Sequence, residues 1–164
     1  MKYILLKGKM NSGKSSTITA ICQNFDINSC QRIILDANGK LIIQNDTTNN
    51  FGNGTFIINI NGSNILIVAG APTEQKITIT QILIFILELQ IEIAVALISV
   101  RSREELKGFD TLSELDKLGH ICILNEEIKR IDIDDYSMNS IWQDRIKRIV
   151  ALINKNLFQT VQMV

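Results

Sequence analysis

A glycine-rich stretch near the start of the chain carries the residue types best suited to chemistry. Residues 8–15 read Gly-Lys-Met-Asn-Ser-Gly-Lys-Ser and match the pattern G-x-x-x-x-G-K-[ST]. Its glycines allow a tight turn in which successive backbone N–H groups point at phosphate oxygens. Lys14 adds a full charge for the β- and γ-phosphates of a nucleotide, and the Ser15 hydroxyl suits Mg²⁺. We therefore predict a site for a nucleoside triphosphate and Mg²⁺.

The segments on either side of this motif fit such a site. Residues 2–7 form an apolar run of strand length, and Ile18, Ile21 and Cys22 recur at helical spacing after it. A helix that begins near Gly13 would add its free N–H groups and its positive dipole end to the anion site. The residues predicted to contact the nucleotide are Gly8, Lys9, Met10, Asn11, Ser12, Gly13, Lys14, Ser15 and Ser16.

The composition limits which binding partners and which cellular compartment we expect for this protein. The 164 residues carry no formal net charge, whereas a protein that follows nucleic acid phosphates has a basic excess, so no nucleic acid is expected. Three cysteines, Cys22, Cys30 and Cys122, lack metal-ligand spacing and are expected to be reduced structural thiols. With the first strand opening at the N-terminus, this predicts a cytoplasmic protein of one domain, residues 1–164.

The longest apolar stretch, residues 77–100, approaches the length of a membrane span. Glu88, Gln90 and Glu92 interrupt it, and the spacing of apolar residues changes there from helical to strand-like. Because carboxylates are costly in hydrocarbon, the stretch is expected to be a buried helix followed by a buried strand, with no membrane contact.

The rest of the chain alternates strands with helices. Asn38-Gly39 and Asn61-Gly62 each separate two apolar runs, which predicts two hairpins. The last helix shows the clearest pattern, a stripe of Trp142, Ile146, Ile149, Val150, Ile153 and Leu157. Strands are expected at residues 31–35, 41–44, 55–60, 64–69, 93–100 and 120–124, and an acidic loop at 125–139. Helices are expected at 73–90, at 102–118 with Ser102 as its cap, and after 139. This order predicts an α/β fold with a mostly parallel sheet, an antiparallel hairpin edge and helices on both faces.

The motif in its strand and helix context resembles the P-loop nucleoside triphosphatase superfamily, which implies a three-layer α/β fold around the sheet. The first half is similar in layout to small GTPases. Aligning Gly70 with their γ-phosphate-sensing glycine puts Ile67 where they have a magnesium-binding aspartate. Their N-K-x-D motif, which recognises the guanine base, is replaced by Asn-Glu-Glu-Ile at residues 125–128, so we expect ATP as the ligand in preference to GTP. A nearer resemblance is to small stand-alone P-loop proteins with an N-S-G-K-[ST] loop and an arginine after the fourth buried strand, here Arg101.

Two side chains beyond the motif are candidates for catalysis. Arg101 follows a buried strand that should end beside the loop, where an arginine can neutralise γ-phosphate charge; it could equally be a solvated helix-terminal residue. Arg103 is a weaker candidate for the same role. Glu74 could orient water or a metal-bound water, or simply favour a helix N-terminus.

Other polar residues were weighed against simpler structural roles. Asp36 in a turn and Asp46 in a loop could supply the missing magnesium carboxylate, and Thr47 and Thr48 occupy the region of the GTPase γ-phosphate-sensing threonine. His120, the only histidine, is expected to open a buried strand and to be structural. The basic residues of the last helix, Arg145, Lys147, Arg148 and Lys155, are expected to form its solvated face.

Three functions remain open at this point. The first is ATP binding with slow, Mg²⁺-dependent hydrolysis of the γ-phosphate, in which Lys14, Arg101 and Glu74 act. The second is a small-molecule or nucleotide kinase, although no acceptor-binding aspartate or multi-arginine lid is visible. The third is a nucleotide-binding module without catalysis. A nucleoside triphosphate is the partner expected in all three; a protein partner or a homo-oligomer is left open.

Overall fold

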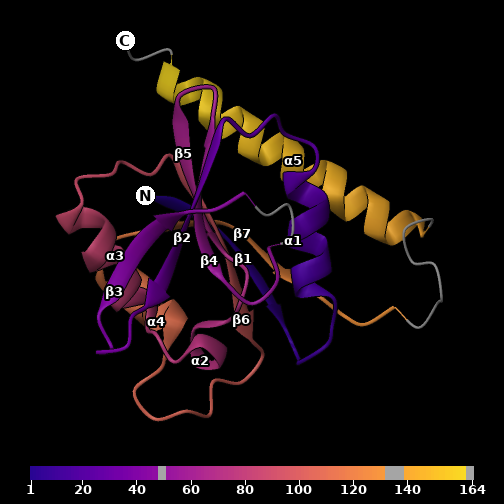
Figure 1. Cartoon of the computed structure of the whole chain (residues 1–164). Helices are drawn as coiled ribbons and strands as arrows, with labels where there is room; N and C mark the ends of the chain where they lie inside the picture. The colour runs from indigo at the N-terminus through magenta and orange to yellow at the C-terminus, as the bar shows by residue number, and fades with distance from the viewer. Residues whose placement is uncertain (48–50, 132–138, 162–164) are drawn as a thin grey trace.

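The computed structural model describes residues 1–47, 51–131 and 139–161, and these build one α/β unit around a seven-stranded sheet (Figure 1). The strand order is β3-β2-β4-β5-β6-β1-β7. The strands are β1 (Lys2–Gly8), β2 (Ser29–Leu35), β3 (Leu41–Asn45), β4 (Thr55–Ile60), β5 (Ser63–Val68), β6 (Val95–Arg101) and β7 (Ile121–Glu127). The helices are α1 (Lys14–Cys22), α2 (Pro72–Gln75), α3 (Ile79–Glu88), α4 (Thr111–Lys117) and α5 (Ser140–Val161).

The sheet is mixed, and its antiparallel part is larger than the hairpin edge that was expected. Strands β5, β6, β1 and β7 pair in parallel, whereas β3, β2, β4 and β5 pair in antiparallel fashion. Both predicted hairpins are present, as β2 with β3 and β4 with β5. β2 also pairs with β4, so the two hairpins merge and half of the strand pairs are antiparallel.

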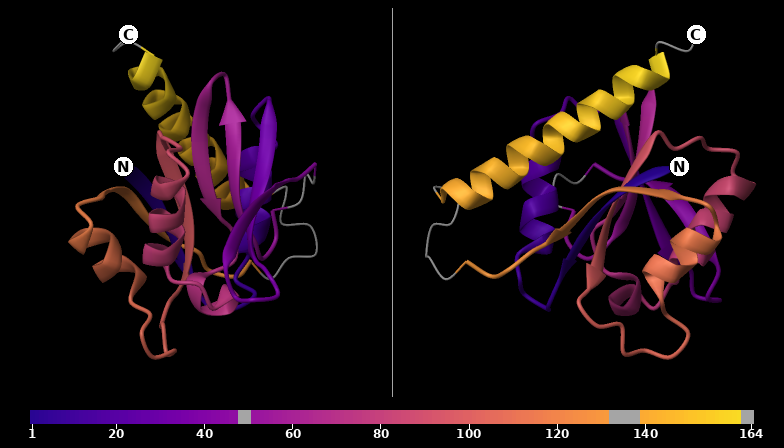
Figure 2. Two further views of the ribbon diagram at one scale, coloured as in Figure 1. Left: turned by 60° about the vertical axis from the view of Figure 1, so that its left-hand side comes forward. Right: turned by 180° about the vertical axis from the view of Figure 1, so that it is seen from behind.

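Helices pack on both faces of the sheet because the central strands are apolar on both sides. In β1, Ile4 and Leu6 belong to the core cluster that α1 and α5 cover. The alternate residues Tyr3 and Leu5 belong to the cluster that α3 and α4 cover. Figure 2 shows the same division, with α3 and α4 across the sheet from α1.

Three predicted elements have different bounds in the structure. The helix expected at residues 73–90 is divided into α2 and α3, because Lys76 adopts a left-handed φ of 56° and Thr78 then caps α3 by accepting from the Gln81 N–H. The helix expected to begin at Ser102 begins nine residues later, with Asp110 as its N-cap. β7 extends through Glu127 into the predicted acidic loop; it is an edge strand, so the expectation that His120 opens a buried strand is wrong.

The thiols occupy three environments, although all are free. Cys22 is buried, Cys30 is half-buried and Cys122 is exposed, so only the first fits the expected structural role fully. Burial raises the pKa of Cys22 to about 12 and that of Cys30 to about 11. Among the described residues, no helix has the length and apolarity to cross a membrane.

Candidate functional site

A pocket of about 920 Å³ lies at the carboxyl ends of β5, β6 and β1, beside the N-terminus of α1. Its size is at the upper end of the range of roughly 300–1,000 Å³ found for small-molecule sites. The lining residues come from most of the chain: Met10, Asn11, Ser12, Gly13, Lys14, Ser15, Ser16, Thr17, Asn53, Ala69, Glu74, Gln75, Ser99, Arg101, Lys129, Arg130, Ile131, Trp142 and Arg145. Residues 10–16 of the predicted loop therefore line this pocket, as do Arg101 and Glu74, whereas Gly8 and Lys9 lie outside the lining.

The loop between β1 and α1 has the backbone shape that its glycines permit. A Cβ at Gly8 would lie 2.7 Å from the Ile128 carbonyl oxygen and 2.5 Å from Ser12 Oγ, so only glycine fits there without movement. Gly13 has a φ of 98°, in the left-handed region that side chains disfavour. Asn11 also adopts a left-handed φ, of 58°. Gly8 is therefore required because neighbouring atoms approach it closely, and Gly13 because of its left-handed backbone conformation.

Lys14 is held inside the loop that it follows. Its Nζ donates to the carbonyl oxygens of Gly8 at 2.8 Å and of Lys9 at 2.7 Å, and the residue is only 6% exposed. Burial lowers the pKa of Lys14, while the Glu74 carboxylate raises it and the Arg101 guanidinium lowers it further. Lys14 thus presents a poorly solvated positive charge at the wall of the pocket, where it gains most from an anionic partner.

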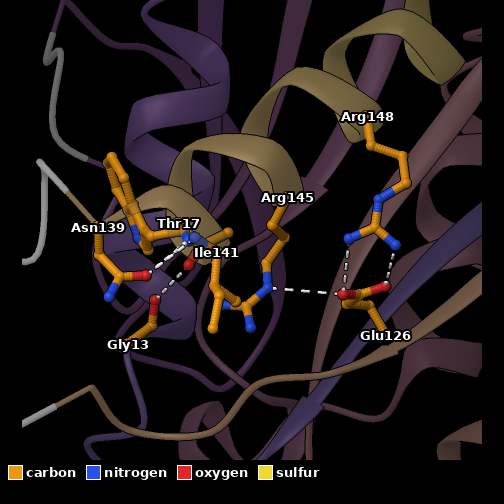
Figure 3. A network of polar contacts seen from close by, with 8 residues as sticks. Gly13, Thr17, Glu126, Asn139, Ile141, Arg145 and Arg148 are labelled. Atoms are coloured by element: carbon orange, nitrogen blue, oxygen red, sulfur yellow. Dashed lines mark hydrogen bonds and ion pairs between the residues drawn. The ribbon is translucent and has the colours of Figure 1, made fainter.

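The first turn of α1 leaves backbone donors at the pocket. Gly13 is the N-cap residue, and among the described residues no side chain caps this helix. The N–H groups of the first turn have no acceptor within a helix, so those of Lys14, Ser15 and Ser16 are available to a ligand. Thr17 instead directs its hydroxyl back to the Gly13 carbonyl at 2.7 Å (Figure 3). The helix terminus, its dipole and Lys14 together favour a negatively charged group.

Arg101 and Glu74 form an ion pair within the pocket. Arg101 Nε donates to Glu74 Oε1 at 2.6 Å, and both side chains are about three-quarters buried. The other oxygen of Glu74 accepts from the Ala71 N–H at 3.3 Å, which fixes the carboxylate near the start of α2. Both candidates for catalysis are therefore brought to Lys14, but each already neutralises the other.

Gly70 has a packing role that differs from the one implied by the GTPase resemblance. A Cβ at Gly70 would lie 2.7–2.9 Å from backbone atoms of Asn53, so the glycine allows that segment to pack closely. The Gly70 N–H donates to the Gly54 carbonyl at 3.1 Å. In this structure the group that would sense a γ-phosphate is thus engaged with the protein.

The other carboxylates considered from the sequence lie away from the pocket lining. Asp36 accepts from the N–H groups of Asn38 and Lys40 in the β2–β3 turn, and Asp46 follows β3. Of the described residues that line the pocket, Glu74 is the one carboxylate. Arg103, Thr47 and His120 also lie outside the lining, and Thr48 is outside the described residues.

Several lining residues were not found by reasoning from the sequence. Ser99 near the end of β6 is fully buried, and within the described structure its hydroxyl has no hydrogen-bond partner. Lys129, Arg130 and Ile131 follow β7, and Trp142 was predicted only as core. In the sequence, the one sign that any of these residues lines a site was the polar Ser99 within an otherwise apolar strand.

Arg145 corrects a prediction. It was expected on the solvated face of α5, but it is 6% exposed and lines the pocket, whereas Lys147, Arg148 and Lys155 are exposed as expected. The helical spacing explains the position, because Arg145 lies three residues after Trp142 and one before Ile146, on the edge of the apolar stripe.

The charges of the lining are strongly unequal. In the described part of the lining, Glu74 is the one carboxylate, against the five cations Lys14, Arg101, Lys129, Arg130 and Arg145, in a chain whose formal net charge is zero. Cationic groups concentrated in a concave site attract and hold anionic ligands. Comparisons with protein-family models, with curated proteins and with solved structures give no match, so the resemblance to P-loop proteins depends on the motif and its surroundings.

Proposed function

We propose that this protein binds a nucleoside triphosphate together with Mg²⁺, that it prefers ATP to GTP, and that it slowly hydrolyses the γ-phosphate. The observation that carries the proposal is the junction of β1 and α1, where the G-x-x-x-x-G-K-S loop, a buried lysine and an uncapped helix N-terminus meet in one cationic pocket. Each of these features favours phosphate, and together they match the charge of a polyphosphate chain.

The donor set also suits Mg²⁺ held mainly by the nucleotide. The Ser15 hydroxyl lines the pocket, and Mg²⁺ in nucleotide sites is bound by phosphate oxygens and waters with few protein ligands. The described residues contain no cluster of three or more carboxylate, histidine or cysteine side chains that would hold the metal without a nucleotide. When bound, the metal would neutralise charge on the β- and γ-phosphate oxygens.

Slow turnover follows from the state of the catalytic candidates. Lys14 would stabilise charge on the γ-phosphate, and Arg101 would assist it after leaving Glu74. The released Glu74 carboxylate could then orient a water molecule. Because the ion pair must open first, and because positioning and charge neutralisation supply nearly all of phosphoryl-transfer catalysis, the rate should be low.

Calorimetric titration tests the binding half of this proposal. The protein is titrated with ATP and GTP analogues with and without Mg²⁺, alongside Lys14→Ala and the matched control Lys40→Ala, which removes an exposed lysine from the β2–β3 turn. Metal-dependent ATP binding that Lys14→Ala abolishes and Lys40→Ala keeps is the expected result. Equal binding by all three proteins would refute the proposed role of the loop.

Measurement of phosphate release separates the three functions. Slow release from ATP with Mg²⁺ and no acceptor would support hydrolysis. Consumption of ATP only when a small-molecule or nucleotide acceptor is present would identify a kinase instead. Binding without turnover under either condition would leave a nucleotide-binding module, in which the Arg101–Glu74 ion pair holds both groups inactive.

A further inference from the structure

Arg145 is a buried cation whose interactions within the protein are incomplete. It projects from the second turn of α5 into the pocket lining, and a carboxylate oxygen of Glu126 on β7 lies 3.6 Å from its Nε (Figure 3). Among the described residues, Nε has no hydrogen-bond partner. A buried donor without a partner is costly, so a ligand that accepts from this guanidinium would be stabilised.

Glu126 is already neutralised by a second arginine. Arg148, one helical turn further along α5, donates to both Glu126 oxygens, at 3.1 and 3.4 Å (Figure 3). The Arg148 side chain is 55% exposed and lies outside the lining of the pocket. Two guanidinium groups thus share one carboxylate, which leaves a net charge of one, and the less satisfied guanidinium is the one that faces the pocket. A phosphate group has the charge and geometry to complete this cluster.

The strand order indicates which phosphate that would be. Arg101 and Glu74 lie on the β5–β6 side of β1 and are close enough to Lys14 to shift its pKa. Lys14 of this motif binds the β- and γ-phosphates, so the terminal phosphate belongs on that side. Arg145 instead lies beside Glu126 of β7, the strand on the other side of β1, and Trp142 lines the pocket one turn before Arg145 on α5. The far end of the polyphosphate, where the nucleoside is attached, faces them.

We propose that Arg145 binds the α-phosphate of the nucleotide, and that the nucleoside lies along the wall that Trp142 forms one turn earlier on α5. This inference rests on the proposed function and adds the direction in which the ligand lies. Arg145 would move from Glu126 to the phosphate, and Glu126 would keep Arg148 as its partner. The half-buried Glu126 carboxylate is therefore not left without a cation when the ligand binds.

The test compares ATP with ADP, because both carry the α-phosphate and only ATP carries the γ-phosphate. Binding is measured by calorimetry and by the fluorescence of Trp142, the only tryptophan in the chain. Arg145→Gln should weaken ATP and ADP by the same factor, about 10- to 100-fold, as expected for a hydrogen-bonded charge pair. Arg101→Gln should weaken ATP more than ADP. Lys147→Gln is the matched control, because Lys147 is an exposed cation on the same helix outside the pocket lining, and it should bind both nucleotides as the unchanged protein does.

The outcomes separate this inference from the proposed function. If the unchanged protein binds neither nucleotide, both fall. If it binds both with the expected Lys14 dependence while Arg145→Gln has no effect, or weakens ATP alone, the assignment of Arg145 is wrong and the function stands. Thermal unfolding checks that each variant folds. Should Arg145→Gln fail to fold, Arg145→Lys keeps the charge but loses the planar donors; a smaller, equal loss for ATP and ADP is expected, and no loss would overturn the inference.

Discussion

At the scale of single residues, the main cost of the site is the burial of Lys14. Its ammonium group is removed from water and held by two carbonyls, at Gly8 and Lys9. These neutral acceptors replace part of the lost hydration but supply no opposite charge, so burial still lowers the pKa of Lys14 from the usual 10.5. A phosphate in the loop would supply that charge and favour the protonated form.

The lowered pKa of Lys14 predicts how nucleotide affinity depends on pH. Phosphate binds the protonated amine, and the amine of the free protein loses its proton at a lower pH than an ordinary lysine. As the pH rises through that lowered value, binding must take up a proton, so affinity should begin to fall before pH 10.5 is reached. Calorimetry across this range provides the measurement.

Lys14→Arg is the control for this pH dependence, because a guanidinium stays charged over the whole range. The variant should bind more weakly but show a flatter profile. An affinity of the unchanged protein that stays constant up to pH 10.5 would contradict the assignment of Lys14 as the titrating group.

The lining residues differ in how far the sequence could predict them. Lys14 and Ser15 were predicted because a local motif fixes the loop and places both at its end. Arg101 was predicted as a neighbour of the loop because parallel strands end at the same edge of a sheet, and Glu74 was predicted from its position four residues after Gly70. Their ion pair could not be predicted, since it depends on the turn into α2. Arg145 was misread because its helix has two sides, and only the packing of α5 against α1 and the sheet decides which of them is buried.

At the scale of elements, the start of α4 is decided by interactions that are not local in the sequence. Ser102 was predicted as the helix cap, but its N–H donates to the Gly8 carbonyl as a continuation of β6. The Glu104 carboxylate accepts hydrogen bonds from both the N–H and the hydroxyl of Thr111, seven residues later in the chain. Asp110 then accepts from the Ser113 N–H and begins the helix.

Removal of each candidate cap gives a prediction. Asp110→Ala should lower the free energy of unfolding by about 1 kcal/mol, the usual effect of losing an N-cap side chain. Ser102→Ala should change it by less than about 0.5 kcal/mol, because only the backbone of this residue is used and a surface substitution has little effect. Urea unfolding of both variants provides the comparison. A larger loss at Ser102 than at Asp110 would contradict the helix start seen in the structure.

The elements that the sequence predicted well are those with a long pattern of their own. The apolar stripe of α5 repeats over four turns, and its members Ile149 and Ile153 are buried as expected. The end of β7 was missed because Glu126 and Glu127 read as an acidic loop. In the structure they pair with Leu6 and Lys7 of β1, and Arg148 neutralises Glu126. A tertiary ion pair thus allows a strand where local composition favours a loop.

At the scale of the whole molecule, the pocket connects distant parts of a chain with no net charge. Its lining extends from Met10 to Arg145, and among the described residues it brings together five cationic side chains and one carboxylate. The charges of the described lining are therefore unequal, although the formal net charge of the chain is zero. Repulsion among these cationic side chains destabilises the free protein locally, and an anionic ligand should relieve this repulsion.

Ligand binding should therefore stabilise the whole fold. At a concentration 100 times the dissociation constant, a ligand that binds only the folded state adds about 2.7 kcal/mol. For a chain of this size this corresponds to a rise in Tm of about 5–11 °C. A thermal unfolding scan with ATP and Mg²⁺ measures the shift. Lys14→Ala should show no shift at the same ligand concentration, whereas Lys147→Gln, which removes an exposed cation outside the pocket lining, should show the full shift. A ligand bound in the loop should need the buried charge of Lys14, which the fold holds there. If Lys14→Ala keeps the rise in Tm, the nucleotide therefore binds outside the loop.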